Sequence, residues 1–280
     1  MTGDPDHCAA LARAADRDRY LSALFAPAQH RDGLMALYAF NAEIARVRDL
    51  AREPMPGEIR LQWWRDVLAG ERDGEAAAHP VAAALRATLT RYGIAPAPLL
   101  DLIDARGFDL YDDPMATLDD LDNYAARTQG ALFSVAAGVL GGEDGSLTHH
   151  AGLAYAIAGI LSGFGRHAAR RQLYVPLEVL ERHGVGREDV FAKVGGAPLQ
   201  AAFAELIRHA LRHLAAAGSG LAVATPVILP ALLPVAVAGP QLRHMEQAGG
   251  DPFAATPMSG LRRQWLIWRA ACDPRRMFEA

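Results

Sequence analysis

Residues 34–53 read LMALYAFNAEIARVRDLARE, twenty residues without a glycine or a proline. Apolar side chains recur along this stretch at three- and four-residue intervals, as at Leu34, Leu37 and Tyr38. Because an α-helix has 3.6 residues per turn, this spacing places them along one stripe of a helix. The stretch predicts a long amphipathic helix, which the PMPG sequence at residues 54–57 ends.

The rest of the chain follows the same pattern. Its 280 residues include 56 Ala and 35 Leu, which favour helices because they lose little side-chain entropy there. No alternating pattern typical of strands competes with the helical one. Further helices are predicted at residues 58–69, 80–92, 97–111, 118–140, 146–171, 177–183, 198–217, 227–239 and 259–269. With short loops and no break in composition, the chain is expected to form one all-α domain, a helical bundle over residues 19–280, after an N-terminal extension of residues 1–18.

Charge and cysteine content exclude several classes of protein. The 28 Lys and Arg against 32 Asp and Glu give a formal net charge of −4, which does not favour nucleic acid as a partner. Cys8 and Cys272 lie near opposite ends without a second cysteine nearby, so neither a disulfide scaffold nor a structural zinc site is expected. Residues 1–20 lack the apolar core of a secretory signal. We expect a cytoplasmic protein.

An uncharged stretch over residues 214–241 is long enough to cross a bilayer. Pro226, Pro230 and Pro234 recur in it at every fourth residue, and each removes a backbone donor from a helix. The prolines favour a buried, interrupted helix over a transmembrane one. Contact with the inner membrane at its surface stays open as an alternative.

Four motifs follow one another in an order and spacing that resemble the squalene/phytoene synthase family. They are ALYAF at residues 36–40, QWWR at 62–65, HPV at 79–81 and LYVP at 173–176. The resemblance implies the all-α fold of isoprenoid (terpenoid) synthases and the head-to-head joining of prenyl groups. It also implies two aspartate-rich motifs, whose carboxylates hold Mg²⁺ against the diphosphate leaving group.

The first of these motifs is depleted of carboxylates in this chain. Active family members follow the Tyr-Ala-Phe run with Cys-Arg and then Asp-Asp-x-x-Asp. The matching residues here are Asn41 and Ala42, and then Ala45, Arg46 and Asp49. Of the three aspartates that the resemblance implies for this motif, only the last, Asp49, is present in this chain.

The second motif, Asn-x-x-x-Asp followed by Glu-Asp, has also lost its ligands. Counting back from LYVP places Gly159, Gly163, Arg166 and His167 at its four positions. They share one helix face, which is now small and basic. We expect no Mg²⁺ and no other cofactor, because Arg46 and Arg166 would repel a metal ion.

The basic residues near these motifs have two interpretations. Arg46 with Asp49 is either a surface ion pair or part of a cavity wall that recognises an anion. The basic run at residues 166–171 either caps a helix or forms a metal-free anion site. The candidate residues of such a remnant cavity are Tyr38, Asn41, Ala45, Arg46, Asp49, Gly159, Gly163, Arg166, His167, Arg170 and Arg171.

Other conspicuous residues are expected to be structural. The small pair Gly159 and Gly163 would allow two helices to pack closely. The aromatic residues Trp63, Trp64, Trp265 and Trp268 are predicted to be core anchors. A solvated helix junction, rather than a metal site, is predicted for the acidic residues Asp109, Asp112, Asp113, Asp119, Asp120 and Asp122.

Asn41-Ala42-Glu43 and the RLQWWR block at residues 60–65 resemble the branch of the family that includes complex I assembly factor 6 proteins. This resemblance implies a non-catalytic binding or assembly factor, whose partner is a respiratory-complex subunit or a retained prenyl or lipid ligand. One alternative is an active prenyltransferase that binds diphosphate through Arg46, Arg166, Arg170 and Arg171. Another is an isoprenoid- or lipid-binding protein.

Overall fold

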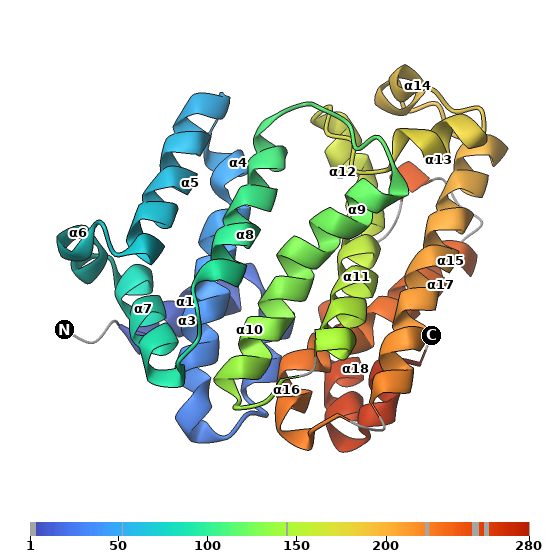
Figure 1. Cartoon of the computed structure of the whole chain (residues 1–280). Coiled ribbons are helices and arrows are strands. Elements are labelled where there is room, and N and C mark those ends of the chain that lie inside the picture. The colour runs from blue at the N-terminus through green and yellow to red at the C-terminus, as the bar shows by residue number, and fades with distance from the viewer. Residues whose placement is uncertain are drawn as a thin grey trace.

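The computed structural model describes residues 4–51, 53–143, 145–221, 224–247, 252–254 and 258–279. Within these residues every regular element is a helix, and most of the longer helices run side by side (Figure 1). The predicted all-α bundle is confirmed.

The N-terminal half is built around one buried helix. Its elements are α1 (Pro5–Ala15), α2 (Arg17–Ala23), α3 (Ala28–Ala45), α4 (Val47–Leu50), α5 (Pro54–Ala69), α6 (Asp73–Ala78), α7 (Pro80–Tyr92), α8 (Ala97–Arg106) and the 3₁₀ turn η1 (Gly107–Leu110). The stretch LMALYAFNAEIA, residues 34–45, supplies most of α3, where Leu34, Leu37 and Phe40 are fully buried. Helices α1, α7 and α10 pack around it.

The C-terminal half packs around α11. Its elements are α9 (Leu118–Ala125), the π-helical segment η2 (Ala126–Gly130), α10 (Ala131–Val139), α11 (Gly145–Ser162), α12 (Phe164–Ala169), α13 (Leu177–Arg182), α14 (Arg187–Phe191), α15 (Ala197–Gly220), η3 (Pro226–Ile228), α16 (Leu229–Leu232), η4 (Leu233–Val237), α17 (Ala238–Gln247), η5 (Pro252–Ala254), α18 (Gly260–Cys272) and η6 (Pro274–Met277). Helix α15 lies along α11, and α17 crosses near both.

The predicted helix over residues 34–53 is two helices. Helix α3 ends at Ala45, and the short α4 follows after Arg46. Beyond Val47 the apolar side chain of Leu50 is exposed, so less packing holds the helix straight there. The PMPG sequence does more than end a helix, because Pro54 is the first residue of α5, where its fixed φ suits a helix start.

The predicted helix over residues 118–140 is continuous but contains a π-helical turn at η2. Gly152 of α11 lies against Gly130 of this turn, so closely that a Cβ at Gly152 would overlap the backbone. The hydroxyl of Thr128, in this turn, donates to the carbonyl of Tyr124 in α9, 2.6 Å away. The π turn therefore lies at a close backbone contact with α11.

The uncharged stretch folds as an interrupted helix. The short elements η3, α16 and η4 each have a proline in their first two positions, and they lead into α17. By length and composition, Pro226–Gln247 could cross a membrane, but 67% of that apolar window is buried inside the fold. Residues 222 and 223 of this stretch lie outside the described residues.

Residues 5–15, inside the segment expected to be an extension, form α1. Cys8 and Ala12 on this helix are fully buried in the core that surrounds α3. The aspartate Asp4 caps the helix by accepting from the backbone N–H of His7. Helix α1 is thus packed into the bundle.

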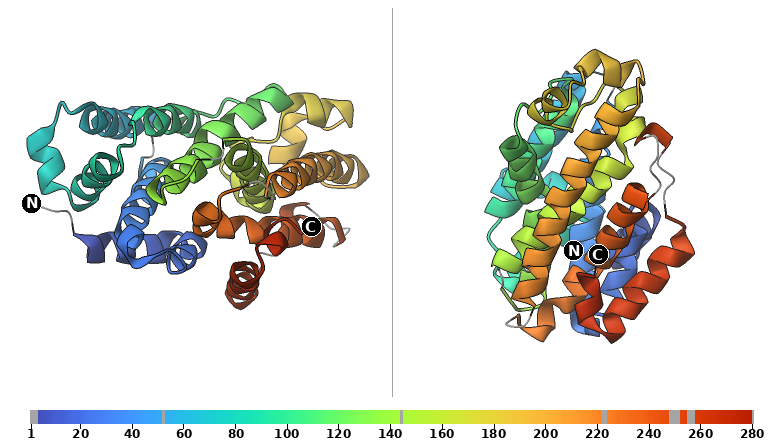
Figure 2. Two further views of the ribbon diagram at one scale, coloured as in Figure 1. Left: turned by 60° about the horizontal axis from the view of Figure 1, so that its bottom comes forward. Right: turned by 90° about the vertical axis from the view of Figure 1, so that its right-hand side faces the viewer.

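The four tryptophans divide between core and surface. Trp64 is buried and packs edge-on against Phe40, with 5.0 Å between the ring centroids. Trp265 and Trp268, however, are 52% and 56% exposed on α18, so the prediction that they anchor the core is wrong. Helix α18 lies at the outer edge of the bundle (Figure 2) and buries its other face, which carries Leu266, Ile267 and Ala270.

Candidate functional site

Two adjoining cavities lie beside α11. The larger has a volume of about 540 Å³ and is lined by Tyr155, Ala158, Gly159, Ser162, Gly163, Gly165, Arg166, Ala238, Gln241, Phe253 and Arg263. The smaller, of about 180 Å³, is lined by Arg106, Tyr124, Thr128, Gln129, Tyr155, Ala156, Gly159, Ile160, His167 and Tyr174. They share Tyr155 and Gly159. The four residues at the second-motif positions thus all line one or both cavities.

The two glycines on this helix face have different surroundings. A Cβ placed on Gly159 would meet no atom within 4 Å, so the prediction that this residue allows close helix packing is wrong. It faces the cavities instead. A Cβ on Gly163 would lie 2.6 Å from Cε1 of His167. The absence of a side chain at Gly163 gives His167 the space in which its ring lies.

His167 is a neutral cavity wall rather than a cation. Its ring lies 4.9 Å from the ring of Tyr174, measured between centroids, in an edge-on contact. Burial and the positive charge of Arg166 lower the pKa of His167 to about 4. At neutral pH the expected basic character of this helix face therefore comes from Arg166.

The charge in the larger cavity is carried by two arginines. Arg263 of α18 is neutralised by Asp18, whose Oδ2 lies 2.9 Å from its Nε, and it also donates to Gln241 over 3.1 Å. Arg166 is exposed and has no hydrogen bond or ion pair to any residue that the structure describes. Among the described residues, Arg166 is thus the guanidinium at this cavity that no carboxylate pairs with. Such a group binds phosphate or carboxylate through paired N–H donors.

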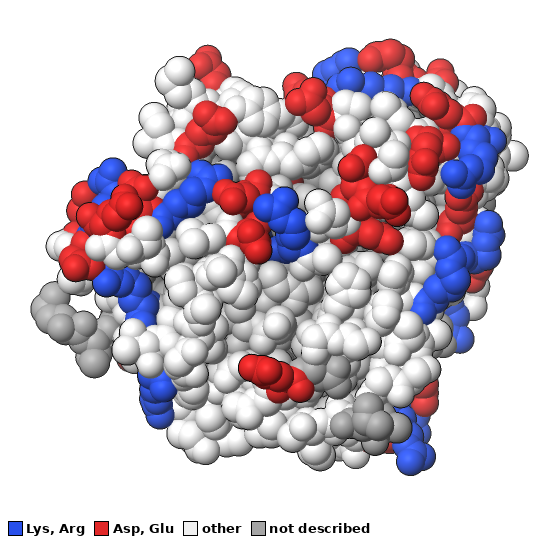
Figure 3. All heavy atoms as spheres, viewed as in Figure 1, with Lys and Arg blue, Asp and Glu red and all other residues white. Residues whose placement is uncertain are grey.

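The remaining basic residues are held elsewhere. Arg170, just after α12, forms an ion pair with Asp49 of α4, which joins the two motif regions at the surface. Arg171 pairs with Glu188 over 3.1 Å. Arg46 is exposed and does not pair with Asp49 in the described part of the chain. On the face shown in Figure 3, acidic and basic groups are interspersed over the upper half, and the lower part is largely uncharged.

Residues of α3 meet the cavities only indirectly. Ala45 is exposed, whereas Tyr38 and Asn41 are buried, and neither the Tyr38 hydroxyl nor Oδ1 of Asn41 has a hydrogen-bond partner among the described residues. The buried Arg19 connects α3 with the cavity wall. Its guanidinium lies 5.9 Å from the centroid of the Tyr38 ring on one side. On the other side it donates to Gln129 over 2.6 Å and lies 4.8 Å from the centroid of the Tyr155 ring. Both of these partners line the smaller cavity.

Two acids of the predicted solvated junction are instead engaged by neighbouring side chains, which corrects that prediction for them. Asp109 is buried and accepts hydrogen bonds from the hydroxyls of Tyr124 and Tyr174, each 2.8 Å away. Arg106 pairs with it over 3.0 Å. The Asp109 carboxylate is therefore stabilised inside the fold by the guanidinium of Arg106 and by the two tyrosine hydroxyls.

The second exception is Asp122, which turns toward two histidines of α15, His209 and His213. This cluster was not predicted from the sequence. Its signal was present, because the HALRH sequence at residues 209–213 puts two imidazoles four residues apart on one helix face.

The residues around the cavities do not fit the magnesium ions that the fold family implies. Mg²⁺ demands octahedral oxygen coordination, usually with one or two carboxylates. Among the described residues, no aspartate or glutamate lines either cavity, and the side-chain oxygens there are those of hydroxyls and amides. Asp49 is engaged with Arg170 at the surface. The described parts of the cavity walls therefore lack the carboxylates that would hold Mg²⁺ against a diphosphate.

Comparison with known proteins agrees with this fold. The sequence model of the family described as squalene/phytoene synthase matches residues 12–269. A Bos taurus protein named NADH dehydrogenase (ubiquinone) complex I, assembly factor 6 is 29% identical over 255 residues, or 90% of this chain and 77% of the relative. A presqualene diphosphate synthase of Sinorhizobium fredii is 29% identical over 203 residues, or 70% of this chain and 71% of the relative. A dehydrosqualene synthase crystal structure with a bound ligand matches at 17% identity with a TM-score of 0.78, over 96% of this chain and 95% of that one.

Proposed function

The chain belongs to the squalene/phytoene synthase family, and from that premise we propose that it is a non-catalytic member that serves as a binding or assembly factor. The partner is a respiratory-complex subunit, in line with the assembly-factor name of its bovine relative. The cavities beside α11 keep a metal-free site for the anionic end of a prenyl-like ligand. The protein works at the surface of the inner membrane.

One observation carries this proposal. Diphosphate ionisation in the family's manner needs carboxylates on two facing helices, yet the α11–α12 side offers Gly159, Gly163, Arg166 and His167. A guanidinium at this place attracts a diphosphate but cannot recruit a divalent cation to it. Because basic and small residues replace the metal-binding carboxylates, we expect the protein to bind a diphosphate without ionising it.

The wall of the larger cavity suits a ligand with one charged and one apolar end. Arg166 supplies the charged donor, while Ala158, Ala238 and Phe253 supply apolar surface. A cavity of about 540 Å³ is within the range of small-molecule sites. This composition favours a prenyl diphosphate or a similar lipid anion over a fully polar metabolite.

The test is calorimetry with farnesyl diphosphate, with Mg²⁺ and with EDTA, on the full chain. We expect binding that EDTA leaves unchanged and no stoichiometric uptake of Mg²⁺ alone. Arg166→Gln should weaken binding by roughly tenfold or more, since a hydrogen bond to a charged group contributes about 1.5–3 kcal/mol. Arg243→Gln, which removes an exposed arginine of α17, is the matched control and should bind as the parent does.

Product analysis separates this proposal from the alternative of an active prenyltransferase, which the similarity to presqualene diphosphate synthases favours. Purified protein is incubated with farnesyl and geranylgeranyl diphosphates. Squalene, phytoene, presqualene diphosphate or released pyrophosphate would overturn the non-catalytic proposal. Lipid that co-purifies, seen by mass spectrometry, without a respiratory-complex partner would favour a lipid carrier.

A further inference from the structure

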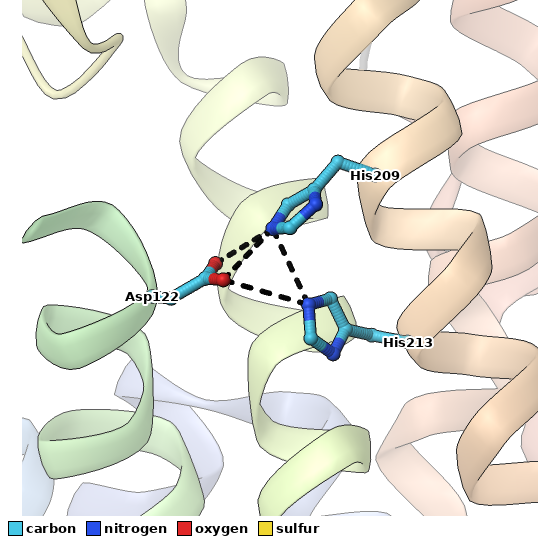
Figure 4. A group of neighbouring side chains, drawn as sticks. All are labelled: Asp122, His209 and His213. Carbon is cyan, nitrogen blue, oxygen red and sulfur yellow. Dashed lines mark hydrogen bonds and ion pairs between the residues drawn. The ribbon is translucent and has the colours of Figure 1, made fainter. Parts of the chain in front are cut away.

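Asp122 of α9 and His209 and His213 of α15 form a compact cluster (Figure 4). None of the three lines either cavity. The two histidines lie one helical turn apart, so both rings project toward the same carboxylate. Two elements that are far apart in the sequence thus place three metal-ligating groups together.

The separations between the three donor atoms match those of a tetrahedral site. His209 Nε2 lies 3.0 Å from Asp122 Oδ2 and 3.3 Å from His213 Nε2, and the third side of the triangle, from His213 Nε2 to Asp122 Oδ2, is 3.6 Å. Zinc bonds of about 2.0–2.1 Å at tetrahedral angles place neighbouring ligand atoms about 3.3–3.4 Å apart. An ion therefore fits with shifts of a few tenths of an ångström.

The surroundings suit a metal that keeps an exchangeable position. The side chains of His209, His213 and Asp122 are 10%, 15% and 25% exposed, so the triangle is held by packing yet open to solvent on one side. One carboxylate offsets part of the ion's charge. Two imidazoles and a carboxylate are typical ligands of zinc sites in which water occupies the fourth position.

A second layer of contacts orients one of the two imidazoles. Nδ1 of His150, on α11, lies 2.9 Å from Nδ1 of His213. When His213 coordinates a metal through Nε2, its proton lies on Nδ1, and His150 can accept it. Metal-binding histidines are ordinarily held by such a partner.

Arg212 opposes the metal-bound state of the other imidazole. Its guanidinium donates to Nδ1 of His209 over 3.0 Å, which places the proton of that ring on Nε2. Coordination through Nε2 requires the other tautomer, so Arg212 must withdraw. Arg212 is exposed, and its side chain is free to move into solvent.

We propose that Asp122, His209 and His213 form a zinc-binding site, with water as the fourth ligand and His150 as the residue that positions His213. The site shares no residue with the proposed anion site. It ties α9 to α15, two walls of the C-terminal half of the bundle.

The test uses Zn²⁺ alone on protein stripped with a chelator and then dialysed. Calorimetry is expected to show one Zn²⁺ per chain, and Co²⁺ in its place should give the visible absorption of a tetrahedral complex. His209→Gln and Asp122→Asn should each weaken Zn²⁺ binding by more than 100-fold. His244→Gln, which removes an exposed histidine of α17, is the matched control and should bind as the parent does.

Two further variants test the surrounding residues. His150→Phe keeps an aromatic ring but removes the acceptor, and it should weaken Zn²⁺ binding by about 10–100-fold. Arg212→Gln places an amide oxygen where it can accept the proton on Nδ1 of His209, and this variant should bind Zn²⁺ more tightly. Circular dichroism establishes that each variant is folded. Absence of stoichiometric Zn²⁺ uptake, or uptake that His209→Gln leaves unchanged, would overturn the proposal, whatever the outcome with farnesyl diphosphate.

Discussion

Acidification from pH 7 to pH 5 is expected to destabilise this protein through His167. The pKa of this histidine is about 4 in the folded chain, because it is buried beside Arg166, whereas an unfolded histidine has a pKa of about 6.5. Between these values the unfolded chain binds the proton and the folded chain does not. Stability is therefore complete above pH 6.5 and falls as the pH decreases toward 4.

The size of the loss follows from the two pKa values. One pKa unit corresponds to about 1.4 kcal/mol, so at pH 5, about 1.5 units below the unfolded value, His167 lowers the free energy of unfolding by about 2 kcal/mol. Urea unfolding followed by circular dichroism, at pH 7 and at pH 5, measures it. Between the two pH values the parent protein should lose about 2 kcal/mol more than His167→Gln, in which the titrating group is absent.

The comparison of variants isolates this histidine from the other nine. His244→Gln removes an exposed imidazole on α17 and should lose as much stability as the parent. Equal losses in the parent and in His167→Gln would refute the reasoning. They would mean that the folded protein accepts a proton at His167 without cost, and that this ring is solvated.

Four substitutions test the packing of the fold, each by urea unfolding. Gly152→Ala should destabilise the fold by about 1–3 kcal/mol because its Cβ would overlap the π turn, whereas Gly159→Ala, whose Cβ meets nothing, should be neutral or slightly stabilising. Arg106→Leu should cost about 3–5 kcal/mol, since it leaves the Asp109 carboxylate buried without its cation. Trp64→Ala should cost about 3–5 kcal/mol from the cavity it creates in the core.

The helical content was predictable because it depends on local sequence. The apolar period of α7 and its flanking Pro80 and Gly93 set both of its ends, and the structure has that helix at Pro80–Tyr92 as predicted. The break between α3 and α4 was not predictable in this way. It depends on which helix covers residues 46–50, and only tertiary packing decides that.

The candidate site was predictable only in part, because burial decides its chemistry. The residues at the second-motif positions do line the cavities, as the helical period implies. The charge of His167 was not evident, since its pKa depends on the cavity wall that covers it. Asp109 and Asp122 look alike in the sequence, yet one is buried under two tyrosines and the other faces two histidines.

Helix α9 links the two proposed sites. Tyr124 lines the smaller cavity, and Asp122, two residues earlier, points to the other flank toward α15. Residues two apart on a helix face nearly opposite directions, so a metal ion that holds Asp122 against α15 also fixes the height and rotation of Tyr124. Through its hydroxyl, Tyr124 holds Asp109, and Arg106 holds both. Any change that zinc makes in the affinity of the cavity for an anion must then be matched by an equal change that the anion makes in the affinity for zinc.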